Sequence, residues 1–326
     1  MRVFVAGASG AIGRQLVPQL IENGHEVIGT YRTIGNADRL QALGAKPVEL
    51  DLLDPDAVRK AVIEAGPDAI VHQATALTGL RDFKHFDRSF ALTNRLRTEG
   101  TDALLAAARE AGVRRIVAQS YASAIYARVG GPVKTEEDPV DPTPVPAMTE
   151  SFAAMVYLDE TIRSAGGIAL RYGGFYGDAS DTLPEPVRKR QFPIVGNGGG
   201  VTSFIHVYDA AAATVLALEH DGPGTYNIVD DEPAPVREWL PFLASVLGAK
   251  PPRRVPPWVA RLFVGDAGVM IATDSRGASN AKAKRELGWT PRYVSWRQGF
   301  VAAYGSASSA DGRESPSATV TPSSAK

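Results

Sequence analysis

The sequence contains no cysteine, no long apolar run and almost no net charge. Without cysteine the chain forms no disulfide, no thiolate nucleophile and no cysteine-ligated metal site, which is consistent with a cytoplasmic protein. The longest apolar-rich run, residues 210–218, is too short to span a bilayer. The net charge of −1 predicts neither a nucleic acid nor an anionic membrane as the partner.

Metal-ligand spacing is also missing from the His, Asp and Glu residues, so we expect no metal. The composition is otherwise that of a globular protein, with 44% hydrophobic and 22% charged residues. The one basic run is residues 188–190, which either meets an anionic substrate or, more commonly for Arg and Lys, lies in a solvated loop. Residues 306–326 are Ser, Ala, Thr and Pro with few apolar side chains, which predicts a disordered tail.

The N-terminal residues carry the most specific pattern in the chain. An apolar run at residues 3–6 precedes GASGAIG, which leads into a helical pattern and then a second strand-like run at residues 26–30. In a strand–turn–helix–strand unit, this glycine pattern predicts a dinucleotide-binding loop rather than a plain tight turn. We expect Gly7 and Gly10 to adopt backbone angles closed to other residues, and the helix start to offer N–H groups to a pyrophosphate. The loop residues are Gly7, Ser9, Gly10, Ala11, Ile12 and Gly13.

The end of the second strand indicates which dinucleotide binds. Units that bind NAD usually place an acidic residue there, on the ribose 2′-hydroxyl. Here residues 29–33 read Gly-Thr-Tyr-Arg-Thr, with no carboxylate. Arg32 can pair bidentately with a 2′-phosphate, which favours NADP(H) over NAD(H). The alternative is that Arg32 is a solvated arginine at a strand end.

Short apolar strands alternate with helices along the chain, which predicts a doubly wound parallel α/β sheet. Strands are expected at residues 46–50, 69–72, 115–119, 168–171, 203–207 and 225–229, and helices at 37–43, 56–65, 93–111, 150–165, 209–220 and 237–248. Ligands of such sheets bind at the carboxyl ends of the strands. The residues expected there are Asp51, Gln73, Ala74 and Thr75. Asp51 accepts a bond from an adenine amino group or, equally, only begins a helix.

The whole pattern resembles an extended short-chain dehydrogenase/reductase of the NAD(P)-dependent epimerase/dehydratase type. The resemblance covers residues 1–303, and beyond the glycine loop it rests on Asp51-Leu52, Asn94, residues 112–117 with Ser120, Leu170-Arg171, residues 175–177, residues 204–207 with Asp209, Tyr226-Asn227, residues 279–282 and residues 286–289. It implies that Leu52, Asn94 and Ser120 also serve cofactor binding. It further implies a Rossmann domain of residues 1–175 plus 202–230, and a smaller α+β substrate-binding domain of residues 176–201 plus 231–305.

The chain departs from this family at the catalytic pair. The family places a tyrosine and, four residues later, a lysine on one helix, and a glutamate commonly follows the lysine by four. If Glu160 is that glutamate, Val156 and Phe152 stand at the lysine and tyrosine positions, and neither can take part in proton transfer. The proton donor of an atypical reductase or isomerase would then come from elsewhere. The candidates are Tyr121, Ser123, Tyr126 and Tyr157, beside Phe175, Tyr176 and His206 on the substrate side.

Three functions fit this departure. The first is an NADP(H)-dependent oxidoreductase that reduces or isomerises a small, aromatic metabolite, since hydride chemistry resides in the cofactor. The second is a non-catalytic NADP(H) sensor or scaffold. The third is a nucleotide-sugar epimerase or dehydratase, which ranks last because that chemistry needs the missing pair. The resemblance also implies a homodimer through helices 93–111 and 149–165.

Replacing Arg32 with alanine tests the cofactor preference. We expect Arg32→Ala to weaken NADPH binding by roughly tenfold or more, because a charge-assisted bidentate contact is lost. NADH binding should change far less. Nicotinamide fluorescence titrations of both cofactors measure this, and an equal loss for both would remove the NADP(H) assignment.

Overall fold

A parallel sheet organises the N-terminal two-thirds of the chain. The computed structural model describes residues 1–77, 82–122, 125–178 and 181–305. Within them, seven strands pair in the order β12-β7-β5-β4-β1-β2-β3, and every neighbouring pair is parallel. Their bounds are β1 Arg2–Ala6, β2 Glu26–Tyr31, β3 Lys46–Glu49, β4 Ala69–His72, β5 Arg115–Tyr121, β7 Ile168–Tyr172 and β12 Gly224–Ile228. This is the doubly wound sheet that the alternating strands and helices predict.

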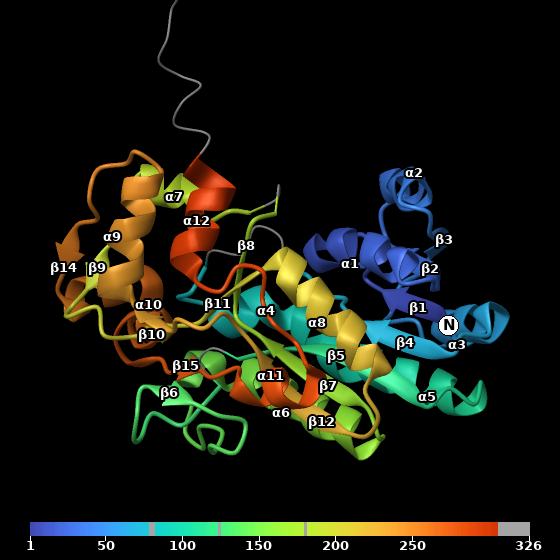
Figure 1. Cartoon of the computed structure of the whole chain (residues 1–326). Coiled ribbons are helices and arrows are strands. Elements are labelled where there is room, and N and C mark those ends of the chain that lie inside the picture. Colours follow the sequence, from blue (N-terminus) through green and yellow to red (C-terminus); the bar gives the residue numbers. More distant parts are fainter. Residues whose placement is uncertain (78–81, 123–124, 179–180, 306–326) are drawn as a thin grey trace, which may run out of the picture.

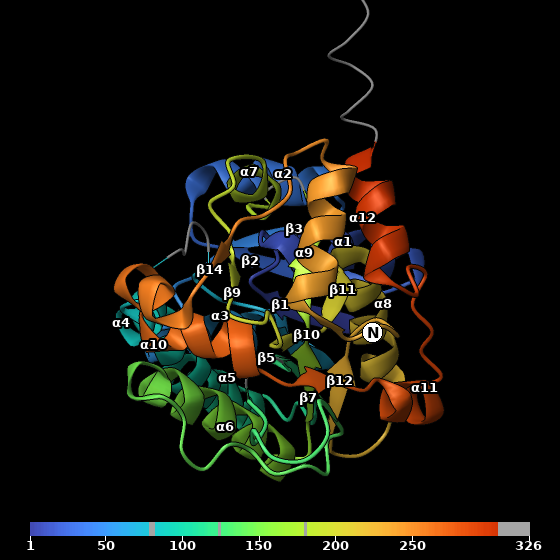
Figure 2. The ribbon, with the colours of Figure 1, turned by 90° about the vertical axis from the view of Figure 1, so that its left-hand side faces the viewer.

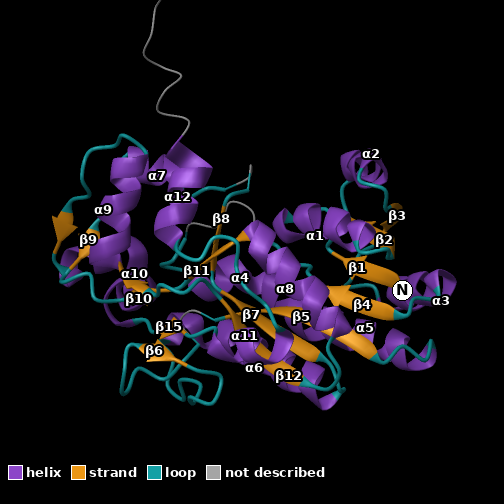
Figure 3. Cartoon of the chain, in the orientation of Figure 1, coloured by secondary structure: helices purple, strands orange, loops and turns teal. Residues whose placement is uncertain are grey.

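Helices cover both faces of the sheet (Figures 1 and 3). One face packs against α1 (Ala11–Glu22) and α8 (Val207–Glu219), and the other against α3 (Pro55–Ala65), α5 (Thr101–Glu110) and α6 (Thr149–Ser164). Strand β1 shows why: Val3 and Val5 enter the first core, whereas Phe4 enters the second. Side chains of a strand alternate between faces, so an all-apolar strand needs a cover on each side.

A second layer of short elements lies beyond the end of the sheet (Figure 2). Its core is aromatic, with Trp239, Trp296 and Phe300 buried against one another. Its helices are α7 (Pro184–Arg188), α9 (Val236–Val246), α10 (Pro257–Asp274) and α12 (Trp296–Tyr304). Two-stranded pairs link it together: β8 (Gly174–Tyr176) with β11 (Phe204–His206), β9 (Ile194–Val195) with β14 (Arg254–Val255), β10 (Val201–Thr202) with β13 (Ala234–Pro235), and β6 (Val133–Lys134) with β15 (Gly277–Ala278).

Several expected elements differ in the structure. The helix expected at residues 93–111 begins earlier, because α4 (Phe86–Arg95) continues through a π-helical segment, η2 (Leu96–Gly100), into α5. Residues 174–176, for which no strand was expected, form β8, which pairs in parallel with β11. Helices α10 and α12 were not expected, because their apolar residues contact partners that are distant in sequence. Among the described residues, no helix is long and apolar enough to cross a membrane.

Helix α11 (Ala281–Leu287) returns to the dinucleotide-binding unit. Ala283, Leu287 and the following Trp289 are buried in the same core as α1 and α8, and Trp289 Nε1 donates to the carbonyl of Asp209 at 3.2 Å. The expected boundaries assign residues 231–305 to the substrate-binding domain, whereas α11 packs in the core of the dinucleotide-binding unit. Short elements complete the fold: η1 (Ile34–Asn36), α2 (Ala37–Ala42) and η3 (Pro146–Met148). The tail expected at 306–326 lies outside the described residues.

The close packing around Gly13 leaves no room for a side chain, so a substitution there should destabilise the protein. A Cβ built on Gly13 would lie 2.2 Å from the carbonyl oxygen of Ala8. We therefore expect Gly13→Ala to lower the free energy of unfolding by about 1–3 kcal/mol. The matched control is Gly35→Ala, where a Cβ meets no atom within 4 Å. Urea unfolding of both variants measures the difference, and equal stabilities would show that the loop yields at Gly13.

Candidate functional site

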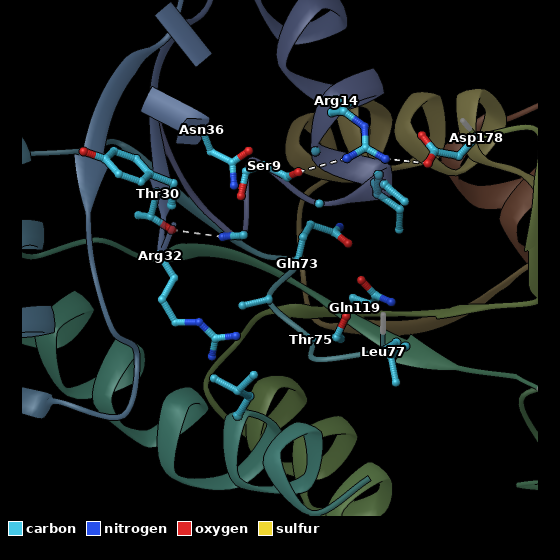
Figure 4. Close-up of a pocket in the computed structure, with 18 of the residues that line it drawn as sticks. Ser9, Arg14, Thr30, Arg32, Asn36, Gln73, Thr75, Leu77, Gln119 and Asp178 are labelled. Carbon is cyan, nitrogen blue, oxygen red and sulfur yellow. Dashed lines mark hydrogen bonds and ion pairs between the residues drawn. The ribbon is translucent and has the colours of Figure 1, made fainter. Parts of the chain in front are cut away.

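A cavity of about 540 Å³ opens at the carboxyl ends of β1, β2, β4 and β5 (Figure 4). The cofactor residues expected from the sequence meet here, apart from Asn94 and Ser120, which do not line it. Those that line it are Gly7, Ser9, Gly10, Ala11, Ile12, Gly13, Arg32, Asp51, Leu52, Gln73, Ala74 and Thr75. The residues that the sequence did not single out are Arg14, Thr30, Asn36, Leu50, Leu77, Leu96, Gln119, Asp178, Asp181, Thr182 and Val207, among others.

The glycine loop fits a pyrophosphate. Gly7 has φ +86°, and a Cβ on it would lie 2.7 Å from the Cα of Ala74, so only glycine fits. Its N–H donates to the Thr30 hydroxyl at 3.0 Å, which ties the loop to β2. Gly10 precedes α1 and offers no side-chain acceptor to the first N–H groups of that helix. Those N–H groups belong to residues that line the cavity, which suits an anion.

Gly10 itself does not need an unusual backbone. Its φ of −74° and ψ of 179° are ordinary extended values, so the expectation of a forbidden conformation is wrong there. Because a Cβ on Gly10 would touch only the Gly7 carbonyl, at 3.3 Å, the missing side chain mainly keeps the helix start open. Only one of the two glycines therefore acts through its backbone angles.

Arg32 stands exposed on the cavity wall just beyond β2. Among the described residues, no carboxylate forms an ion pair with it, so its guanidinium can receive an anion. Asp51 also lines the cavity, and its carboxylate accepts the Leu53 N–H at 3.0 Å. That bond is the turn role that the sequence left open for Asp51, and the second carboxylate oxygen remains for a ligand.

An ion pair between Arg14 and Asp178 spans the far rim of the cavity in Figure 4. Arg14 belongs to the first turn of α1, and its Nη1 also donates to the Ser9 carbonyl at 3.2 Å. Asp178 follows β8, so the pair joins the glycine loop to the second layer. The sequence held one signal for this contact, the arginine immediately after the glycine motif.

The inner end of the cavity is lined by Gln73, Gln119, Phe175 and Tyr176. Gln73 Nε2 donates to the Tyr172 hydroxyl at 3.1 Å, and that hydroxyl also lies 2.6 Å from the Thr214 hydroxyl. These bonds hold the amide in place. Phe175 packs at a tilt on Tyr172, with ring centroids 5.5 Å apart. Phe175 and Tyr176 therefore give this end of the cavity an aromatic part beside the two amides.

Two of the four candidate proton donors lie away from the cavity. Tyr126 is buried, donates to Asn227 Oδ1 at 2.6 Å and accepts from Arg171 at 3.1 Å, and burial raises its pKa to about 12. Tyr157 lies on the outer side of α6 and donates to Asp102 at 2.7 Å. Neither residue lines the cavity, and the hydroxyls of both are already bonded, that of Tyr126 to Asn227 and Arg171 near the carboxyl ends of β12 and β7, so their catalytic roles stay predictions.

Of the remaining two candidates, Tyr121 and Ser123, the structure describes only the first. Tyr121 ends β5, two residues beyond Gln119, and is half-buried beside the cluster that contains Ala122 and Phe152. It is not part of the cavity wall. Ser123 lies outside the described residues.

Helix α6 carries its buried carboxylate at Asp159, not at Glu160. Asp159 Oδ2 accepts from Arg171 Nε at 2.7 Å in the protein interior, whereas Glu160 is exposed. Phe152 and Val156 pack against Ile125 and Tyr126 and do not line the cavity. The placement of the lost pair at Phe152 and Val156 stays a prediction, and a register set by the buried carboxylate would place it one residue earlier.

If Asp159 marks the family's glutamate, the tyrosine–lysine pair is missing as well. Four and eight residues before Asp159 stand Met155 and Ser151, and both are buried. Ser151 donates to Asp87 at 2.7 Å and accepts from Asn94 at 3.1 Å. Asn94 is thus committed to α6 rather than to the cavity. No tyrosine or lysine faces the cleft from α6 in either register.

Arg97 is a buried cation that the sequence did not reveal. It lies in η2, is 4% exposed, and its Nε has no hydrogen-bond partner within the described residues. Burial lowers its pKa to about 10, partly offset by Asp159. The buried hydroxyl of Ser120 is likewise without a partner. These two polar groups lie next to cavity residues Leu96 and Gln119 in the sequence.

His206 and Tyr176 are packing residues at the edge of the cavity. His206 Nδ1 accepts from the Tyr208 N–H at 3.1 Å, and its ring stacks on Tyr293 at 4.2 Å. Burial lowers the pKa of His206 to about 4, so it is neutral near pH 7. It lines a smaller cavity of about 340 Å³ beside Asp178. Tyr176 is fully buried against Phe300, and burial raises the pKa of its hydroxyl.

Comparison with known proteins gives a consistent result. The model of the NAD dependent epimerase/dehydratase family matches residues 3–229. A 3-diazoavenalumate denitrifying reductase from a Streptomyces species is 42% identical over 309 residues, which are 92% of this chain and 99% of the relative. A 2-alkyl-3-oxoalkanoate reductase of Stenotrophomonas maltophilia is 30% identical over 264 residues, 76% of each chain.

The solved structure of a Thermus thermophilus UDP-glucose 4-epimerase, a complex with NAD, has a similar fold. It superposes with a TM-score of 0.73 at 27% identity and covers 95% of this chain and 100% of its own. The cavity lies at the switch between the β1–β2 and β4–β5 halves of the sheet, where doubly wound folds bind ligands.

The environment of Asp230 predicts how stability depends on pH. Asp230 is buried after β12, its Oδ2 has no partner among the described residues, and burial raises its pKa to about 8. Because the pKa is raised, the folded protein holds a proton on Asp230 at pH values where the unfolded chain has lost it. The free energy of unfolding therefore falls as pH rises from about 4 to about 8. We expect Asp230→Asn to be more stable than the parent at pH 8 and nearly equal at pH 4. Unfolding across that range tests this, with exposed Asp221→Asn as the control; a parallel pair of profiles would contradict it.

Proposed function

The chain belongs to the NAD-dependent epimerase/dehydratase family and is an NAD(P)-dependent oxidoreductase, and we propose that it uses NADP(H) to reduce a small aromatic diazo compound. One observation carries the proposal: α6 presents no tyrosine–lysine pair to the cleft in either register. The reaction should therefore need no proton from that helix. The 42% identical relative, a denitrifying reductase named for a diazo compound, supports this substrate class.

The preference for NADP(H) rests on charge at the end of β2. Arg32 is exposed at the cavity without an ion-pair partner in the described chain, while its neighbours Thr30, Tyr31 and Thr33 bring no carboxylate. A planar guanidinium matches a phosphate bidentately. Asp51, on the next strand end, already accepts a backbone N–H. These groups favour a 2′-phosphate over a bare ribose hydroxyl.

The proposed reaction balances without acid catalysis. The reduced nicotinamide supplies a hydride, and a hydride that replaces the nitrogen of an aryl diazonium gives the arene, N₂ and the oxidised cofactor with no proton consumed. The chain then has to bind the substrate and the cofactor, orient them, and exclude water from the cleft. The glycine loop and Arg32 would hold the cofactor, and Phe175 would present an apolar wall to the aromatic ring. The bonded Gln73 would keep the inner end rigid.

Ketone reduction is the second candidate, favoured by the 30% identical 2-alkyl-3-oxoalkanoate reductase. Hydride addition to a carbonyl leaves an alkoxide that must gain a proton. Of the described candidate donors, Tyr121 is the one whose place, at the end of β5, suits this role. A non-catalytic NADP(H) sensor would bind cofactor and turn over neither substrate. A nucleotide-sugar epimerase ranks last, because α6 lacks the pair.

Isotope transfer tests the proposed reaction. NADPH deuterated at one or the other C4 face is mixed with the full-length protein and an aryl diazonium such as 4-hydroxybenzenediazonium. We expect deuterium from one face only to appear at the aryl carbon that carried nitrogen, since an enzyme site holds the ring in one orientation. Transfer from both faces equally would be the uncatalysed reaction and would contradict the proposal.

The Tyr121→Phe variant separates the two reductase candidates. For diazonium reduction we expect kcat to stay within about threefold of the parent, because no proton is needed. For a ketone substrate, the loss of a general acid should cost roughly 10²-fold or more. Tyr157→Phe, remote from the cavity, is the matched control. NADPH binding without turnover of either substrate would indicate the sensor.

A further inference from the structure

Helix α10 is apolar on two opposite sides. Its inner side, Ala260 and Val264, packs on Val195 and Val269. Its outer side carries Trp258, Leu262 and Phe263, which are 67%, 64% and 75% exposed. Trp258 and Leu262 are four residues apart and therefore lie on one helix face, with Phe263 beside them. Contiguous exposed apolar side chains of this size mark an interaction surface.

Packing behind α10 holds this outer side in place. Gly265, with φ +63°, breaks the helix, and a Cβ on it would lie 2.9 Å from the Cα of Lys84. Lys84 Nζ in turn donates to the Leu262 carbonyl at 3.5 Å. The first half of α10 is therefore fixed at the surface by its inner contacts. The outer side chains contribute little to this packing, so the fold does not account for them.

Basic residues are frequent in the segment that leads into α10 and in the run at residues 188–190. The run at residues 188–190 reaches the segment before α10, since Arg190 Nε donates to the Pro251 carbonyl at 3.0 Å. Residues 185–190 and 250–266 carry seven basic and two acidic side chains, a net charge of +5. The basic residues are Arg188, Lys189, Arg190, Lys250, Arg253, Arg254 and Arg261. Figure 2 faces this end of the molecule, where α7, β14 and α10 lie together.

The whole-chain charge hides this segregation. A net charge of −1 gave no reason to expect an anionic partner, yet residues 185–190 and 250–266 together carry a net charge of +5. Arg253 and Arg254 are exposed, and no carboxylate pairs with either one among the described residues. Arg261 pairs with Asp266 at 2.7 Å. Charge complementarity therefore calls for an acidic surface against the apolar side chains.

We propose that this face, Trp258, Leu262 and Phe263 with Arg253 and Arg254, docks the protein on an anionic membrane surface. Tryptophan, phenylalanine and leucine flanked by Arg and Lys are the side chains that enter the headgroup region from an interfacial helix. Anionic lipid headgroups attract Arg253 and Arg254. On a docked protein the headgroups lie close enough that salt does not screen this attraction fully. The three apolar side chains project outward instead of lining a groove, which suits a fluid surface better than a partner helix. This proposal does not depend on the substrate or the cofactor.

Vesicle sedimentation of the full-length protein tests the proposal. We expect binding to phosphatidylcholine vesicles that contain a third phosphatidylglycerol, and roughly tenfold weaker binding to pure phosphatidylcholine. The double variants Trp258→Ala/Phe263→Ala and Arg253→Glu/Arg254→Glu should each reduce the binding by about tenfold or more. These positions are exposed, so the variants should melt at the parent temperature.

Exposed positions on α3 provide the matched controls. Ile63→Ala and Lys60→Glu, in the dinucleotide-binding unit, should leave vesicle binding unchanged. Absence of binding to the anionic vesicles, or binding that survives either double variant, would overturn the proposal. Self-association of the parent chain in light scattering that Trp258→Ala/Phe263→Ala abolishes would overturn it too, and would assign the face to a second copy.

Discussion

The close approach of two backbones at Gly7 is the constraint on which the rest of the site depends. The place of a Cβ on Gly7 lies 2.7 Å from Ala74, so β1 and β4 deliver their chain ends almost in contact. The Gly7 N–H bond to Thr30 adds β2 to the same point. Three strand ends thus converge on a turn without side chains, and α1 starts there with open N–H groups. An anion is the ligand that this geometry favours.

The buried polar side chains around α6 and the neighbouring strands differ in how many of their atoms are hydrogen-bonded. Tyr126, Asn227, Arg171 and Asp159 form one bonded chain inside the protein, which stabilises the sheet against α6. Within the described part of the chain, Asp159 Oδ1 and Asn227 Nδ2 of that network have no hydrogen-bond partner, and neither do Arg97 Nε and the Ser120 hydroxyl. Unpaired polar atoms therefore remain on α6, β12, η2 and β5 alike.

Charge and apolar surface are arranged differently on the face of the second layer formed by α7, β14 and α10. The glycine loop and Arg32 offer backbone N–H groups and a guanidinium to an anion inside a cavity whose wall also carries Asp51, Asp178 and Asp181. The face of α7, β14 and α10 presents positive charge around projecting Trp258 and Phe263, where only an extended surface can meet it. The two features share no residue, so binding at one does not require the other.

The sequence by itself determined the doubly wound sheet, the dinucleotide loop and many of the residues that line the cavity, though not Arg14, Thr30 or Leu50. These depend on local patterns: alternating apolar strands, glycines at fixed spacing and strand ends that must share one edge. It did not determine that the hydroxyls of Tyr126 and Tyr157 are bonded, because their partners lie 101 and 55 residues away. It placed the carboxylate of α6 at Glu160, whereas packing against Arg171 buries Asp159, one helical step of about 100° away. The ion pair of Arg14 with Asp178, the buried Arg97 and the exposed side of α10 were likewise decided by tertiary contacts, which bring together segments that no local pattern relates.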